Sequence, residues 1–252
     1  MIKSSWKDKI QIFLSCIALT IIWEYFAIKM NNDIYLPTIG QVLQNLRLII
    51  NDNNFLYNVG YTMIRALISF LLSLGIAVVV GVTSYLSNVF KNFITPINSL
   101  IQSTPTMIVI VLALIWFDKD KSAYIIGFSV VFPILYNAVL GSLNSIDKNI
   151  NEMMDIYSVR IIEKIRYVYM PSIKIKLVPI LISTFSLGIK VVIAGEIYGQ
   201  PKYGIGSIIQ LEKTNFNTPA IFAWIIIIGL ISIILNYVQS YISNKNYKWR
   251  KI

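Results

Sequence analysis

The sequence predicts an all-α integral membrane protein with about six transmembrane helices. Of its 252 residues, 56% are hydrophobic and only 13% are charged, whereas soluble chains carry about 25% charged residues. The apolar residues fall in runs of about 20, the length that a helix needs to cross a ~30 Å hydrocarbon core. Charged residues gather between these runs and at the two ends of the chain.

The runs divide the chain into six expected spans joined by polar segments. Residues 1–55 should hold the first span and a short outer helix, and residues 56–252 should hold the other five spans. The expected spans cover about residues 10–28, 63–86, 93–117, 123–143, 177–197 and 221–241.

The first region combines a basic start with an amphipathic continuation. Lys3, Lys7 and Lys9 precede the first apolar run, and no cleavage signal follows it, so we expect a retained span. Glu24 near its outer end is better explained as an interfacial or protein-facing carboxylate than as a pathway residue. In the polar segment 29–55, apolar residues recur at helical spacing, which predicts an amphipathic helix along the outer interface.

The third and fourth expected spans carry proline and polar residues. Proline removes a backbone hydrogen bond, and in lipid the freed carbonyl must be satisfied by protein or by water in a cavity. A kinked helix that lines a pathway and a kink that serves only packing are equally compatible with this pattern. The residues concerned are Pro96, Gln102, Ser103, Thr104, Pro105, Pro133 and Asn137.

The fifth expected span contains two charged residues, Lys190 and Glu196. A lysine at mid-span costs roughly 2.5–3.5 kcal/mol unless it is paired or faces water. Lys190 therefore either lines a cavity and favours an anion, or pairs with Glu24 or Glu196. Gly199, Gly204 and Gly206 follow and predict an irregular re-entrant segment. Arg65, at the head of the second span, can extend toward the interface.

The distribution of basic residues gives an orientation. With the N-terminus inside, the segments on the inner side carry 14 Lys and Arg residues and those on the outer side carry six. This asymmetry follows the positive-inside rule and predicts that both termini are cytoplasmic.

The composition also excludes several classes of function. The chain has no histidine and a single cysteine, Cys16, which excludes a His/Cys metal site and a Ser-His-Asp triad. No Walker A motif is present, so we expect no ATP hydrolysis by this chain. The basic residues form no basic helix or aromatic-basic face of the kind that binds nucleic acid.

A polar segment, residues 149–171, lies between the fourth and fifth spans. Asn149 and Glu152 could form a capping box that starts a short helix. Met153, Met154, Tyr157 and Ile161 would then lie near one face, as adaptable apolar contacts for a partner. We expect Ser158 to break the chain and Pro171 to stop a second helix. The alternative is an amphipathic helix on the inner leaflet, with Arg160, Lys164 and Arg166 near the headgroups.

The spacing in this segment resembles the cytoplasmic coupling loop of ABC-importer permeases, Glu-Ala-Ala-x3-Gly-x9-Ile-x-Leu-Pro. Glu152 and Pro171 match the pattern, whereas Met153 and Met154 replace the alanines and Ser158 replaces the glycine. Thr62-x-x-Arg65 and Gly195-Glu196 also resemble segments of these permeases, in the class that transports nitrate, sulfonates, taurine or bicarbonate.

The resemblance implies the transmembrane domain of a type I ABC importer in a bacterial cell membrane, with a cytoplasmic coupling helix and a permease core over 56–252. It implies two copies of an ABC ATPase that bind ATP and Mg, a second copy of this permease, an extracytoplasmic binding protein, the lipid bilayer and no nucleic acid. The solute would be small, such as a sulfonate, taurine, nitrate or a thiamine precursor.

The resemblance and the residue chemistry together nominate two sets of residues. The ATPase-coupling candidates are Glu152, Met153, Met154, Asp155, Tyr157, Ser158 and Pro171. The translocation-pathway candidates are Arg65, Gln102, Ser103, Thr104, Pro105, Asn137, Lys190 and Glu196. A stand-alone secondary transporter or channel is the alternative; it predicts an inverted repeat and more mid-membrane acids than Glu24 and Glu196.

Overall fold

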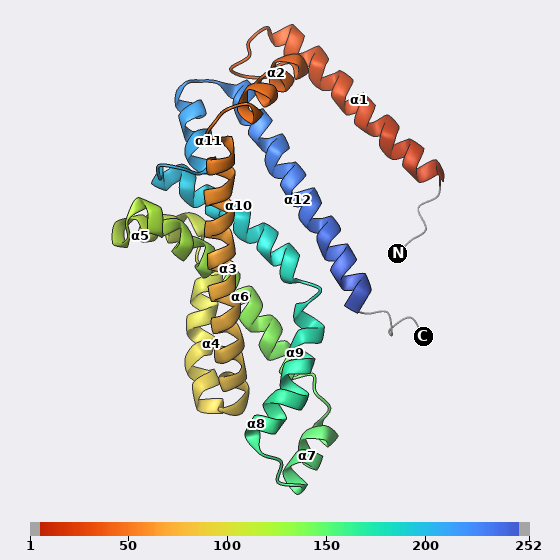
Figure 1. The fold of residues 1–252 in the computed structure, drawn as a ribbon, viewed down its shortest axis with the longest axis vertical. Helices are drawn as coiled ribbons and strands as arrows, with labels where there is room; N and C mark the ends of the chain where they lie inside the picture. Colours follow the sequence, from red (N-terminus) through yellow and green to blue (C-terminus); the bar gives the residue numbers. More distant parts are fainter. Residues whose placement is uncertain (1–5, 247–252) are drawn as a thin grey trace. The chain divides into compact units, whose positions relative to one another are not determined.

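The computed structural model describes residues 6–246, and within this range every regular element is a helix (Figure 1). Lys3, Lys248, Arg250 and Lys251, which entered the charge count above, lie outside the described residues. The elements are α1 (Trp6–Met30), α2 (Ile39–Ile50), α3 (Phe55–Leu86), α4 (Asn88–Ser103), α5 (Thr106–Trp116), α6 (Lys119–Leu143), α7 (Lys148–Ile156), α8 (Ile161–Lys164), the π-helix η1 (Ile165–Tyr169), α9 (Met170–Leu177), α10 (Leu181–Gly199), α11 (Ile205–Thr214) and α12 (Thr218–Asn246).

Among these helices, five are long and apolar enough to cross a membrane: α1, α3, α6, α10 and α12. The sixth candidate is the pair α4 and α5, which is bent by 103°. The prediction of an all-α membrane protein with about six spans is therefore confirmed.

The third expected span is broken rather than kinked. Thr104 is extended, with φ −73° and ψ 124°, because the ring of Pro105 disfavours helical geometry in the residue before it. Pro105 itself precedes the first residue of α5. In contrast, Pro96 lies inside α4 without ending it.

The described residues divide into two compact units, of which the first comprises the chain up to Leu56 together with Ile208–Gly229. Here Thr38 caps α2 in a capping box with Gln41. The carboxylate of Glu24 accepts a hydrogen bond from the backbone N–H of Ile39 at 2.9 Å, which places a negative charge at the positive end of the helix dipole. Glu24 therefore faces protein, as one of the two interpretations expected.

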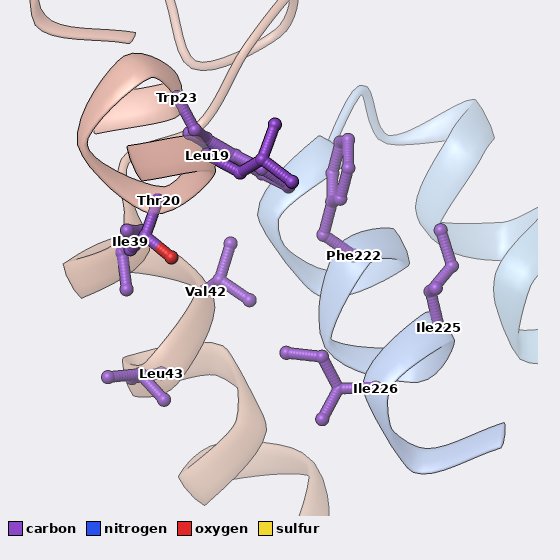
Figure 2. A pocket seen from close by; sticks show the side chains of 9 residues that line it. All are labelled: Leu19, Thr20, Trp23, Ile39, Val42, Leu43, Phe222, Ile225 and Ile226. Atoms are coloured by element: carbon purple, nitrogen blue, oxygen red, sulfur yellow. The ribbon is translucent and has the colours of Figure 1, made fainter. Parts of the chain in front are cut away.

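A cavity of about 410 Å³ lies in this first unit among α1, α2 and α12 (Figure 2). Its lining side chains carry two polar groups: the Thr20 hydroxyl donates to the backbone oxygen of Cys16 at 2.8 Å, and the Trp23 indole N–H donates to that of Pro37 at 2.8 Å. The cavity thus offers no free polar group of its lining side chains to a polar solute. The lining residues are Leu19, Thr20, Trp23, Ile39, Val42, Leu43, Phe222, Ile225 and Ile226.

The second unit comprises Tyr57–Ser207 with the chain after Gly229. Its main core is formed by buried residues of α3, α6, α7, η1 and α9, with partly buried residues of α10 against it. Gly127 of α6 allows α3 and α10 to approach closely, since a Cβ there would lie 2.8 Å from Ser69 Oγ and 2.9 Å from Val192 Cγ2. In lipid the hydrophobic effect does not drive helices together. Small residues instead let the backbones approach closely, so that van der Waals packing stabilises the contact.

Candidate functional site

The segment expected to contact an ATPase folds as a short helix, α7, that lies with α8 at one end of the second unit (Figure 1). The start of α7 differs from the expectation. Asp147 is the N-cap, and its carboxylate accepts a hydrogen bond from the backbone N–H of Asn149 at 2.9 Å. The expected capping box of Asn149 and Glu152 is wrong, because Asn149 already lies in the first turn and an aspartate two residues earlier occupies the cap.

Ser158 ends this helix in the left-handed conformation, with φ 48°. The backbone N–H of Val159 donates to the carbonyl of Met154 at 2.9 Å, so the turn satisfies an otherwise free carbonyl at the end of the helix. A left-handed residue is usually glycine because a Cβ costs roughly 1–2 kcal/mol there. The position that is glycine in the resembling pattern is therefore a position that needs glycine-like geometry.

Pro171 does not stop the second helix as expected. The helix continues from α8 through η1 and α9 to Leu177, with Pro171 in the first turn of α9. The turn before the proline is a π turn, in which the N–H of Met170 donates to the carbonyl of Ile165. Since proline has no N–H and its ring crowds the carbonyl four residues earlier, the wider π turn explains how the helix passes Pro171.

Several exposed side chains of α7 and its C-cap Tyr157 are apolar. Met153, Ile156 and Tyr157 are 51%, 80% and 77% exposed, and Ile150 lies one turn earlier at 41%. We call these four residues the coupling face. Met154, expected on the same face, is instead buried in the core at 3% exposure. Ile150 and Ile156 were missed, although their spacing of three residues on either side of Met153 signals a common helix face.

Acidic residues flank the coupling face. Glu152 is exposed, and Asp155 pairs with Lys164 of α8. The hydrogen bond from Lys164 to the Asp155 carboxylate raises the pKa of the lysine above its ordinary value. This pair joins the two helices on either side of Ser158 and so limits the angle between them.

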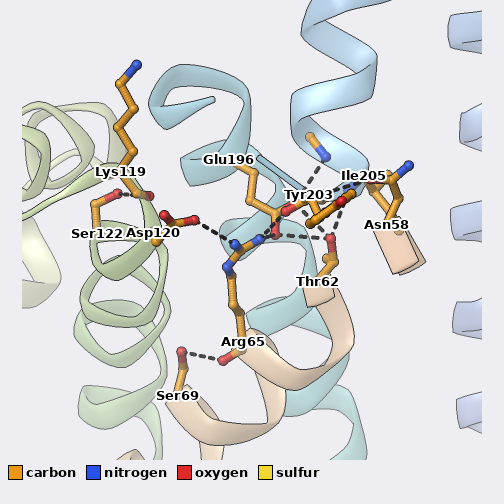
Figure 3. A network of polar contacts seen from close by, with 12 residues as sticks. Asn58, Thr62, Arg65, Ser69, Lys119, Asp120, Ser122, Glu196, Tyr203 and Ile205 are labelled. Carbon is orange, nitrogen blue, oxygen red and sulfur yellow. Dashed lines mark hydrogen bonds and ion pairs between the residues drawn. The ribbon is translucent and has the colours of Figure 1, made fainter. Parts of the chain in front are cut away.

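A second polar cluster lies inside the second unit around Glu196 of α10 (Figure 3). Its carboxylate, with no exposed surface, accepts hydrogen bonds from Arg65 Nη1 at 2.8 Å, from the Thr62 hydroxyl at 2.8 Å and from the Gly206 N–H at 3.0 Å. Arg65 also donates to the carbonyl of Tyr203 at 2.6 Å and to Asp120 at 3.2 Å. The cluster thus joins α3, α6 and α10 to the turn before α11.

Glycine is required where this turn covers the carboxylate. Gly204 has φ 157°, and a Cβ there would lie 2.7 Å from Glu196 Cδ. At Gly206 a Cβ would overlap the carbonyl oxygen of Ile193 and the Cβ of Glu196. The N–H groups of Gly204 and Ile205 donate to the side chains of Asn58 and Thr62, at 3.1 and 2.9 Å. The expected irregular segment is therefore a tight turn fastened onto α3.

This geometry assigns two pathway candidates a structural role. Arg65 is 3% exposed and Glu196 is fully buried, and each is engaged by the other and by backbone groups. Glu196 thus pairs with Arg65. It does not pair with Lys190, as one interpretation of that lysine required. The pairing across 131 residues leaves no local sequence signal.

The other pathway candidates lie nearer the surface of the second unit. Gln102, Ser103, Pro105 and Asn137 are exposed and Thr104 is half-buried. The hydroxyls of Ser103 and Thr104 donate to the carbonyl of Leu100 in their own helix. Asn137 accepts a hydrogen bond from the buried Asn98 of α4 at 3.1 Å, which joins α4 to α6.

Lys190 lies at the middle of α10, tenth of its 19 residues. Its side chain is exposed, as are those of Ser183 and Leu187 on the same helical face. Among the side chains that the structure describes, those of residues 10, 11 and 13–238, no ion pair involves Lys190. A charged residue at this depth needs water or a further partner.

Glu196→Gln should destabilise the second unit strongly. It leaves the buried Arg65 without its main counter-charge, and breaking a buried pair costs roughly 3–5 kcal/mol. Asp120→Asn is the matched control, because the Asp120 side chain is 70% exposed and exposed pairs contribute about 0–1 kcal/mol. Thermal unfolding in detergent measures both, and an equal or larger loss for Asp120→Asn would contradict the assignment.

Ser158→Gly should tighten the end of α7, because glycine adopts the left-handed conformation without the roughly 1–2 kcal/mol penalty of a Cβ. Ser158→Val should loosen it. Hydrogen exchange at the Val159 N–H, which is bonded to Met154, is expected to slow in the first variant and accelerate in the second. Unchanged exchange in Ser158→Val would show that this turn does not limit the local structure.

Comparison with known proteins identifies the family. A family model for the inner membrane component of binding-protein-dependent transport systems matches residues 73–246. A putative ABC transporter permease protein of Methanocaldococcus jannaschii is 24% identical over 242 residues, which cover 92% of this chain and 89% of that protein. The putative aliphatic sulfonates transport permease protein SsuC of Bacillus subtilis is 24% identical, over 85% of this chain and 78% of that protein.

The riboflavin transport system permease protein RibX of Chloroflexus aurantiacus is 25% identical over 62% of this chain and 58% of that protein. Relatives named for different solutes thus share similar sequence identity with this chain. The family match covers every element from the middle of α3 to the end of α12. The chain therefore belongs to the family of inner membrane components of binding-protein-dependent transport systems, the permease subunits of ABC importers.

Proposed function

We propose that this permease subunit moves a small solute, delivered by an extracytoplasmic binding protein, with energy from a separate ABC ATPase that docks on α7. The observation that carries the proposal is the coupling face. Four apolar side chains are presented on a short capped helix that joins the candidate spans α6 and α10. ATP and Mg would be bound by the ATPase, since this chain has no Walker A motif.

The chemistry of the coupling face suits a protein groove. Interface energy concentrates in a few apolar or aromatic side chains at the centre of the contact. Ile156 and the C-cap Tyr157 are the most exposed of the four, and methionine adapts its shape to a partner. Glu152 and Asp155 would lie at the rim. In the proposed assembly two ATPase subunits bind two copies of this permease, one on each α7.

The charge distribution supports the orientation that this proposal needs. Fourteen basic residues fall in segments on the proposed inner side and six on the outer side. We infer from the positive-inside rule that both termini and α7 are cytoplasmic. An ATPase in the cytoplasm could then reach the coupling face.

For the pathway we propose the exposed face of α10 that contains Lys190. An exposed lysine at the middle of a span is costly in lipid, so this face should line water at the axis between two permease copies. A positive charge there favours an anionic solute. Gln102 and Asn137, also exposed, are the neutral polar candidates. The solutes for which two relatives are named, aliphatic sulfonates and riboflavin, do not select between an anion and a neutral molecule.

Ile156→Ser should weaken ATPase binding about 5- to 30-fold, the loss expected for one central interface residue worth about 1–2 kcal/mol. Val89→Ser is the control, because Val89 is 82% exposed but lies on α4 outside the coupling face. Co-purification of the ATPase from native membranes measures the effect, with Glu152→Ala tested alongside. Equal capture by both serine variants would remove the coupling face from the interface.

If the wild-type chain instead purifies alone and transports without ATP, the stand-alone transporter is the better function. That result would contradict the docking of an ATPase on α7 without contradicting the fold.

Lys190→Met should reduce uptake of a radiolabelled alkanesulfonate at least about fivefold, because it removes a favourable charge worth about one kcal/mol or more in a low-dielectric passage. Lys190→Arg, which keeps the charge, should retain most of the uptake. Proteoliposomes with the ATPase and the binding protein provide the assay, and riboflavin serves as the comparison solute. Unchanged sulfonate uptake in Lys190→Met would exclude a role for this charge.

A further inference from the structure

Tyr85, in the last turn of α3, contacts both limbs of the coupling segment. Its hydroxyl accepts a hydrogen bond from Asn151 Nδ2 of α7 at 3.0 Å. Its ring packs edge-on against Tyr169 of η1, with centroids 5.3 Å apart and planes at 81°. One half-buried side chain thus touches the helix before Ser158 and the helix after it.

Both contacts lie against the core rather than on the free surface. Tyr169 is 4% exposed and belongs to the main core of the second unit. Burial raises the pKa of its phenol, so Tyr169 stays neutral beside Tyr85. Met154, three residues after Asn151, is buried in the same core. The inner side of α7 is therefore seated on Tyr85 and its neighbours, while the coupling face points outward.

Along the chain, α7 is linked directly to α6 and, through three short helical segments, to α10. It has no such direct link to α3. Residues 144–147 join α7 to α6, and α8, η1 and α9 join it to α10. A force applied to the coupling face reaches α3 only through side-chain contacts. Edge-on aromatic packing adds about 0.5–1.5 kcal/mol beyond the buried area, and the hydrogen bond fixes the direction of the phenol.

The far end of α3 holds the polar cluster. Tyr85 and Arg65 are 20 residues apart on one helix, a distance of about 30 Å at 1.5 Å per residue. Arg65 and Thr62 bind Glu196 and the turn before α11. A displacement of α3 at Tyr85 would therefore act on that turn.

We propose that Tyr85 is the positioning residue that transmits the displacement of the coupling helix to α3. This inference rests on the proposed docking of an ATPase on α7. Tyr85 does not touch the ATPase or the solute in this assignment; it sets how far α3 follows α7. Its loss should reduce the solute moved per ATP while ATPase binding is kept.

Tyr85→Phe is the variant that tests this, since it removes the acceptor for Asn151 and keeps the ring against Tyr169. Tyr136→Phe is the matched control: the Tyr136 hydroxyl donates to Ser84 at 3.2 Å, so its loss removes a hydrogen bond between α6 and the same end of α3 without touching α7. Asn151→Ala removes the other partner of the Tyr85 bond.

Reconstituted transporter, with its ATPase and binding protein, gives three readouts: ATPase capture, thermal unfolding, and alkanesulfonate uptake per ATP hydrolysed. We expect Tyr85→Phe and Asn151→Ala each to lower uptake per ATP at least about threefold with unchanged capture. The double variant should match the single ones, because both remove one interaction. Tyr136→Phe should lower the unfolding temperature only.

Any of these results would overturn the proposal: an unchanged ratio in Tyr85→Phe, an equal fall in Tyr136→Phe, or additive losses in the double variant. A fall in ATPase capture would also overturn it, since Tyr85 would then shape the docking surface instead of transmitting motion. Failure of the proposed function looks different, because the wild-type chain would then capture no ATPase. Riboflavin replaces the sulfonate as the probe if the wild type transports only riboflavin.

Discussion

The ion pair of Arg65 and Glu196 imposes the strongest constraint on the second unit. Neither charge reaches water, so each must be matched by the other and by hydrogen bonds. Glu196 obtains these from Thr62 and the Gly206 N–H, and Arg65 obtains them from the Tyr203 carbonyl and Asp120. The positions of α3, α6, α10 and the turn before α11 are therefore coupled, because a shift of one would leave a buried charge unmatched.

Close helix packing extends this constraint along the unit. The absence of a side chain at Gly127 lets Ser69 and Val192 meet α6, and the Ser69 hydroxyl donates to the carbonyl of Tyr124 at 3.0 Å. Toward the other end, the hydroxyls of Tyr136 and Tyr85 bond to α3 and α7 partners. The helix α3 is thus held at both ends and along its length, whereas α7 is held on its inner side and by the Asp155–Lys164 pair to α8.

Much of the fold was predictable because span length and hydropathy are local properties. The family was predictable from the spacing of Glu152, Ser158 and Pro171, and Ser158, expected to break the chain, has a left-handed conformation. The break at Pro105 was harder, since proline marks a disruption but its 103° angle depends on packing against α6. The cap at Asp147 was missed because several residues before α7 can accept an N-cap bond.

The site was less predictable than the fold, for a physical reason. Periodicity placed Met154 with Met153, but neighbouring residues on a helix point about 100° apart, and only the core decides which is buried. The partner of Arg65 lies 131 residues away, and no pattern within one helix reveals such a pairing. Lys190 was identified by its charge in an apolar run, which is a local signal.

The order of the partners along the chain has a consequence for biogenesis. Arg65 is synthesised 131 residues before Glu196, an interval of roughly 7–26 s at about 5–20 residues per second. Asp120 follows Arg65 after 55 residues but stays mostly exposed in the folded unit. During that interval the guanidinium must stay near water or beside the insertion machinery, because an unmatched arginine in lipid costs several kcal/mol. The second helix of the chain to cross the bilayer, α3, can settle only when the fifth, α10, arrives.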